Sequence, residues 1–172
     1  MFNIRNMEPD LGEEQFLEED LKKCKETKCD AKCCYNISPV KEWVAEYFMF
    51  HDKIRDKLVS DGVKIDFREG RFFFERCFNK GKCSFLKHSP EGVDLRPIEC
   101  KIYPYRVDWH SVDFDNKIVI LFCIDGNCPL VKDKAENERY KKEVERIIKR
   151  DFALLFNGAQ FEVAFFKDGE YE

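Results

Sequence analysis

The sequence has no long hydrophobic run, which excludes a membrane-spanning helix of ordinary length. Its longest unbroken apolar stretch covers residues 118–124, far short of the roughly 20 residues that cross a bilayer. Residues 1–15 include several acids and no apolar segment, so they do not resemble a secretory signal peptide. We therefore expect a cytoplasmic protein with no membrane partner.

Motifs of several common enzyme classes are also missing. The chain has only 8 glycines, and it contains neither a glycine-rich phosphate loop nor a dinucleotide-binding fingerprint. It has no Ser–His–Asp arrangement of a hydrolase, no repeat and no low-complexity segment. The net charge of −4 makes nucleic acid an unlikely partner.

Cysteine is the residue that stands out, with 9 in 172 residues. An odd number cannot pair completely, and a reducing compartment disfavours structural disulfides. Cysteines that merely fill a core would be scattered, and these avoid the long predicted helices. They form three groups in the sequence: Cys24, Cys29, Cys33 and Cys34; then Cys77, Cys83 and Cys100; then Cys123 and Cys128.

Hydrophobic periodicity predicts a single α+β domain over residues 1–172, with two long helices, small antiparallel strand pairs and cysteine-rich metal-binding loops. The predicted long helices cover residues 40–58, after Ser38-Pro39, and 133–156. The shorter predicted elements are an acidic helix at 13–23, strand pairs 63–67 with 71–76 and 105–109 with 117–124, a turn at 79–82, a helical turn starting at 96–97 and a last strand at 160–166.

Metal binding explains this cysteine pattern best. Thiolates are soft donors that favour zinc or iron–sulfur clusters over magnesium or calcium. Residues 71–106 contain eight Lys and Arg against four acids, and nearby cations stabilise thiolates; an ordinary solvated basic face is the alternative. Cys29–Cys33 and Cys123–Cys128 have spacings that suit zinc, whereas the adjacent pair Cys33-Cys34 favours a site with more than one metal.

Other side chains near the cysteines are secondary candidates. Arg96 and Lys101 flank Cys100 and are the candidate cofactor-binding residues, where they would tune a thiolate site through charge and hydrogen bonds. His51 lies on the apolar face of a predicted helix and is expected to be a core residue. His88 and His110 follow cysteine-bearing segments and are either accessory ligands or exposed loop residues.

The block Arg-Pro-Ile-Glu-Cys-Lys-Ile-Tyr-Pro at 96–104, preceded by Cys77-Phe78 and by Lys82-Cys83-Ser84-Phe85-Leu86, resembles the YkgJ-like CxxCxxCC family of zinc- or iron-chelating domains. The resemblance covers about 24–129, and the helix and strand at about 133–166 lie beyond it. Flagellin lysine N-methylases look related through the same cysteine motif, which there accompanies an iron–sulfur cluster. The wide spacing after Cys24 departs most from the family pattern, so Cys24 is the first candidate for a cysteine that is not a ligand.

These features predict a cysteine-ligated metalloprotein. A 4Fe–4S iron–sulfur cluster is the favoured cofactor, with two metal sites possible, and the resemblance implies redox chemistry, protein modification or metalloprotein maturation. An unidentified protein or redox partner is implied with it. The alternative is a structural Zn²⁺ module that binds a partner protein. The sequence does not decide whether the chain is an enzyme.

Overall fold

The computed structural model describes residues 40–42, 54–68, 71–79, 82–89 and 95–166. These residues form helices together with small sheets, so the α+β class is confirmed. A helical segment at 54–60 and the labelled elements appear along the chain in the following order: β1 (Val40–Glu42), β2 (Lys64–Arg68), β3 (Arg71–Glu75), β4 (Phe78–Asn79), β5 (Lys82–Cys83), α4 (Ser84–His88), α5 (Ile98–Lys101), β6 (Tyr105–Val107), β7 (Ile118–Cys123), α6 (Pro129–Lys132), α7 (Lys134–Leu155) and β8 (Glu162–Phe165).

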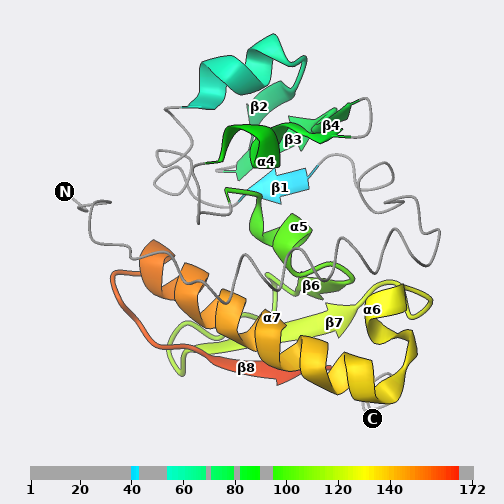
Figure 1. Cartoon of the computed structure of the whole chain (residues 1–172). Coiled ribbons are helices and arrows are strands. Elements are labelled where there is room, and N and C mark those ends of the chain that lie inside the picture. The colour runs from blue at the N-terminus through cyan, green and yellow to red at the C-terminus, as the bar shows by residue number, and fades with distance from the viewer. Residues whose placement is uncertain (1–39, 43–53, 69–70, 80–81, 90–94, 167–172) are drawn as a thin grey trace.

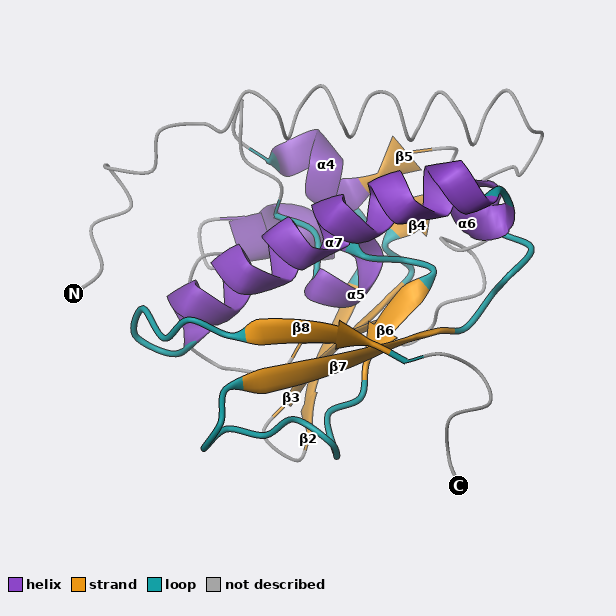
Figure 2. Cartoon of the chain, turned by 90° about the horizontal axis from the view of Figure 1, so that it is seen from below, coloured by secondary structure: helices purple, strands orange, loops and turns teal. Residues whose placement is uncertain are grey.

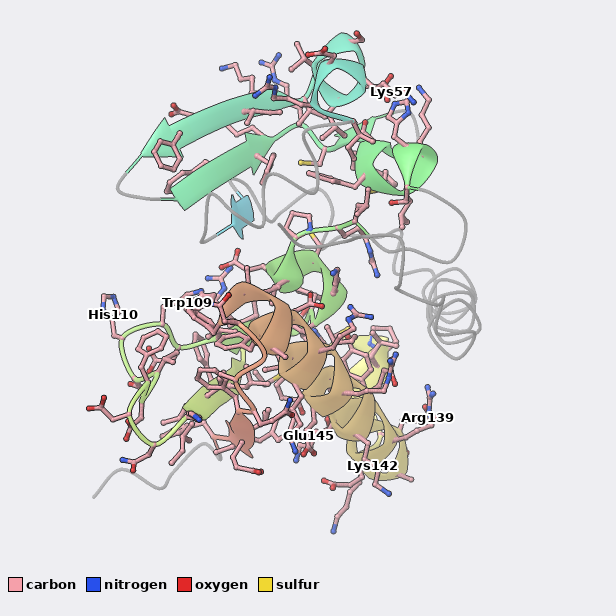
Figure 3. All side chains as sticks on the ribbon, turned by 90° about the vertical axis from the view of Figure 1, so that its left-hand side faces the viewer. Lys57, Trp109, His110, Arg139, Lys142 and Glu145 are labelled. Atoms are coloured by element: carbon pink, nitrogen blue, oxygen red, sulfur yellow. The ribbon has the colours of Figure 1, made fainter. Side chains whose placement is uncertain are left out.

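The long helix α7 lies across one face of a three-stranded sheet ordered β6-β7-β8 (Figure 2). Its buried side chains recur at helical spacing and meet Val119 and Leu121, the fully buried residues of β7. Arg139 and Lys142 project outward from α7, whereas Glu145 lies on the flank of the helix and pairs with Lys149, which also reaches Glu162 of β8 (Figure 3). The buried residues of the helix are Tyr140, Val144, Ile147, Ile148, Asp151 and Phe152.

Local signals set both ends of α7. The Asp133 carboxylate accepts a hydrogen bond from the Glu136 amide at 3.0 Å, which caps the first turn. At the other end Asn157 and Gly158 adopt positive φ angles of 53° and 80°, as expected of residues that stop a helix. The helix predicted over 133–156 is therefore confirmed almost to the residue.

The last strand runs in an unexpected direction. We predicted small antiparallel pairs, and β6 with β7 is antiparallel, but β8 pairs in parallel with β7. The 22-residue helix α7 separates β7 from β8 in the chain, and such a crossover returns the chain to the same end of the sheet. This part of the fold prediction was incomplete because pairing direction depends on the connection.

The second sheet has the order β1-β3-β2, with antiparallel pairing throughout. Strands β2 and β3 confirm the pair predicted at 63–67 and 71–76. The long helix predicted from residue 40 is wrong at its start, since β1 is a strand that pairs with β3 in the register Val40 opposite Phe74. Pairing with a neighbouring strand here overrides a helical pattern. The structure confirms the predicted helix end, because the helical segment 54–60 stops at the turn of Asp61 and Gly62.

Two hydrophobic clusters organise the described residues, and α5 lies between them (Figure 1). The larger cluster joins α7 to the β6-β7-β8 sheet. The smaller one gathers side chains from the helical segment 54–60, β3 and α4 around Phe74 and Phe85, whose rings meet edge to face at 5.1 Å. Residues 13–23 and the greater part of 40–58, where helices were predicted, lie outside the described residues.

Candidate metal centre

A short antiparallel ribbon, formed by the two-residue strands β4 and β5, brings Cys77 and Cys83 close together. In this ribbon Phe78 lies opposite Cys83 and Asn79 lies opposite Lys82. The Ser84 amide, just after the ribbon, donates a hydrogen bond to the Cys77 carbonyl at 2.8 Å. This bond joins the residue before β4 to the residue after β5. The two cysteines therefore bracket the ribbon at the end where α4 begins.

Helical geometry turns Cys100 toward the same cluster. Ile98 and Ile102 are four residues apart, so they share one side of α5, and both are buried in the larger hydrophobic cluster. Cys100 is two residues from each, about 200° around the helix, and it packs against the smaller cluster together with Cys77 and Cys83. One helical turn thus places an apolar face toward α7 and a thiol toward the ribbon.

The three thiols lie within electrostatic range of one another, and burial dominates their pKa shifts. Burial, with a smaller contribution from the charge of Cys83, raises the pKa of Cys77 to about 12. Burial also raises the pKa of Cys100 well above its usual value; the Arg96 guanidinium opposes this shift, and the charges of Cys83 and Cys77 add to it. A thiol with such a pKa is protonated at neutral pH unless a cation replaces the proton.

Cys123 and Cys128 lie elsewhere, in the larger cluster beside α7. Cys123 ends β7 and lies opposite Tyr105 in the strand pair. Burial, followed by the charge of Cys123, raises the pKa of the Tyr105 phenol to about 12. Cys128 precedes α6 and is 5% exposed. The five described cysteines therefore form two separate groups, three beside the ribbon and two beside the sheet.

The first cysteine group, Cys24, Cys29, Cys33 and Cys34, lies outside the described residues. The five cysteines within the described part are thiols that form no disulfide. In that same part of the chain, no three His, Cys, Asp or Glu side chains are placed to hold one metal ion. The expectation that all cysteine loops meet at one site thus stays a prediction; within the described residues, Cys77, Cys83 and Cys100 pack against the same hydrophobic cluster.

The two candidate cofactor-binding cations differ in their surroundings. Arg96 is half-buried and close enough to Cys100 to lower the pKa of its thiol. Lys101 points the other way: its ammonium lies 2.8 Å from the Asp151 carboxylate, with 3% of the lysine side chain exposed. Arg96 is therefore placed to act on the thiols through its charge, whereas Lys101 contacts α7.

Neither His88 nor His110, the two histidines in the described part of the chain, belongs to a group placed to hold a metal ion. The His88 ring nitrogen Nε2 lies 2.9 Å from the Asp61 carboxylate, which also accepts from Lys87 at 2.7 Å. His110 is exposed, and Figure 3 shows it pointing away from the neighbouring elements. His51 lies outside the described residues.

Two residues of α7 contact the cysteine-bearing segment and were not singled out from sequence. Asp151 binds Lys101, and the Tyr140 hydroxyl donates to the Tyr103 carbonyl at 2.6 Å. Asp151 had a detectable signal: it lies four residues after Ile147 and three after Ile148, so it is an acid on the apolar face of an amphipathic helix.

Comparisons of this chain with protein-family models, with curated proteins and with solved structures find no match. No helix in the described residues is both long and apolar enough to cross a membrane.

Proposed function

We propose that this chain is a cysteine-ligated metalloprotein that holds a 4Fe–4S cluster beside the β4–β5 ribbon. The observation that carries the proposal is the grouping of Cys77, Cys83 and Cys100, three thiols from two separate elements, with Arg96 beside them. Soft thiolate donors suit iron–sulfur clusters and zinc. The role of the cluster would be redox chemistry, protein modification or metalloprotein maturation, as the family resemblance implies.

The surroundings of Cys77 and Cys100 fit metal ligands better than reactive cysteines. A nucleophilic cysteine needs a lowered pKa and access to solvent, whereas the pKa of Cys77 rises to about 12 and that of Cys100 rises well above its usual value. Apolar side chains such as Phe74 and Phe85 pack around the site. Thiols of this kind release their protons when a metal binds, and the apolar shell would keep solvent from a cluster.

The remaining ligand is proposed to come from the first cysteine group. A 4Fe–4S cluster usually has four cysteine ligands, and the ribbon site supplies three. Within that group Cys29, Cys33 and Cys34 fit the family pattern best, and Cys24 fits it least. A second metal site would use Cys123 and Cys128, which lie apart from the ribbon.

The test is metal analysis and spectroscopy of the full chain purified without oxygen. We expect a brown protein that contains iron and acid-labile sulfide and gives an EPR signal after reduction. A colourless protein with stoichiometric zinc would overturn the iron–sulfur assignment in favour of the Zn²⁺ module. A folded protein with no bound metal would overturn both.

Matched cysteine variants locate the site. Cys83 and Cys123 each end a strand and are half-buried, so Cys123→Ser is the matched variant that separates loss of the ribbon site from loss of the proposed second site. We expect Cys83→Ser and Cys100→Ser to lower metal content and thermal stability together, since metal binding and folding are coupled. Equal metal content in Cys83→Ser, Cys100→Ser and the parent would refute these ligands.

A further inference from the structure

A pair of opposite charges is buried between α5 and α7. The Lys101 ammonium donates to Asp151 Oδ2 at 2.8 Å, and only 3% and 1% of the two side chains are exposed. The other carboxylate oxygen, Oδ1, accepts from Arg150 Nε at 2.9 Å and Nη2 at 2.7 Å. Both oxygens of Asp151 therefore have charged donors, and one of those donors belongs to the residue that follows Cys100.

Such a pair is poorly explained by stability alone. Removing two charges from water costs free energy that offsets most of their mutual attraction, and apolar residues of similar volume often give the same stability. Loss of only one partner is nevertheless strongly destabilising, because the other charge is left buried and unpaired. Charge-assisted hydrogen bonds differ from apolar contacts in having a defined direction and length. The pair therefore fixes the position of the Lys101 side chain relative to α7 more narrowly than packing would.

The helical turn that carries Cys100 needs such a restraint. It has only four residues and no side-chain cap at its start, and a single turn is unstable by itself because its nucleation is unfavourable. Burial of Ile98 and Ile102 holds it against α7, but apolar contacts tolerate rotation and sliding. Any rotation of α5 would swing Cys100 away from Cys77 and Cys83.

We propose that Asp151 is a positioning residue for the cysteine site, acting through Lys101 to fix the direction of the Cys100 thiol. This inference rests on the proposed function, because it concerns the same three thiols. It assigns a role in the metal centre to a helix that has no cysteine and lies outside the segment that resembles the family.

The first test is Asp151→Asn in the full chain, purified without oxygen. Loss of a residue that orients a metal ligand typically lowers metal affinity by about 10- to 100-fold, and we expect a loss in that range together with a shifted reduction potential and EPR spectrum. The matched control is Glu145→Gln, which removes a partly exposed carboxylate from the flank of the same helix, where it pairs with Lys149. Parent-like affinity and spectra in Asp151→Asn would overturn the proposal.

The double variant Lys101→Met with Asp151→Leu separates positioning from stability, and it stands in if Asp151→Asn does not fold. It removes both charges and keeps most of the buried volume, so we expect a thermal stability close to that of the parent. A positioning role predicts that its reduction potential and EPR spectrum remain shifted. Spectra identical to those of the parent at equal stability would show that the pair is only structural.

Cysteine alkylation keeps this inference distinct from the proposed function. If the folded parent holds no metal, the proposed function fails, and the alkylation rate of Cys100 by iodoacetamide, measured by peptide mass spectrometry, decides whether Asp151 positions it. We expect Asp151→Asn to speed alkylation of Cys100 and leave Cys128, buried beside α7, unchanged. Equal acceleration at both cysteines, or at neither, would refute positioning.

Discussion

The Tyr140 hydroxyl connects α7 to the backbone just after the cysteine-bearing turn, and its removal should weaken the fold measurably. It donates to the Tyr103 carbonyl at 2.6 Å and lies 3.4 Å from the Lys101 carbonyl. The ring is 2% exposed and stacks on Tyr105 with the centroids 6.2 Å apart. Tyr140→Phe keeps the ring and its packing, so the change isolates the hydrogen bond.

The expected magnitude follows from the environment of the carbonyls. A buried acceptor that loses its donor costs about 1–3 kcal/mol. The contact with Lys101 is too long to add much, and the bond to Tyr103 is only partly buried, so we expect a loss of about 1–2 kcal/mol in the free energy of unfolding. For a chain of this size, that corresponds to a fall in melting temperature of about 2–8 °C.

Urea unfolding followed by tryptophan fluorescence and circular dichroism measures this loss. Trp109 is a reporter for the same core because it stacks on Phe152 at 5.5 Å. The matched control is Tyr103→Phe, whose hydroxyl reaches the half-buried Asp125 at 3.1 Å, and we expect a smaller effect there. A Tyr140→Phe variant no less stable than Tyr103→Phe would refute the reasoning.

Three further predictions test other parts of the structure. Asp133→Ala removes the side-chain cap of α7 and should cost about 1 kcal/mol in urea unfolding, and an unchanged midpoint would contradict the capping role. Phe152→Ala empties a fully buried site against Phe161 and should cost about 3–5 kcal/mol; a loss below that of Asp133→Ala would show that the core is not packed there. The hydrogen bond from Lys87 lowers the pKa of Asp61, and His88 contributes less. Because the folded-state pKa is lowered, the Asp61 carboxylate stabilises the fold above the unfolded-state pKa, and this stabilisation is lost as pH falls through the folded-state pKa. The melting temperature of Asp61→Asn should therefore lie below the parent at pH 6 and approach it toward pH 2, and a difference independent of pH would exclude this linkage.

The separation of the described cysteines into two groups limits which of them could ligate the same metal site. A single site that used every cysteine would need Cys123 and Cys128 beside the ribbon, but both lie in the cluster around α7. Cys77, Cys83 and Cys100 remain as the set for the ribbon site. The Cys83→Ser and Cys123→Ser comparison therefore tests the grouping as well as the chemistry.

The sequence by itself determined the elements whose signals are local. The spacing of Tyr140, Val144 and Ile148, the cap at Asp133 and the stop at Asn157-Gly158 specify α7 without reference to the rest of the chain. The strand pair β2–β3 and the short turn holding Cys100 were predictable for the same reason. Side-chain periodicity and turn chemistry act over a few residues, so they can be read from the sequence.

Only the tertiary structure decided which elements meet. Residues 40–42 pair with β3 although their sequence pattern favours a helix, and β8 joins β7 in parallel because of the crossover through α7. The grouping of three thiols and the partner of Lys101, 50 residues away at Asp151, depend in the same way on how α5 packs between two clusters. These contacts join residues far apart in the chain, and no local pattern specifies the partner.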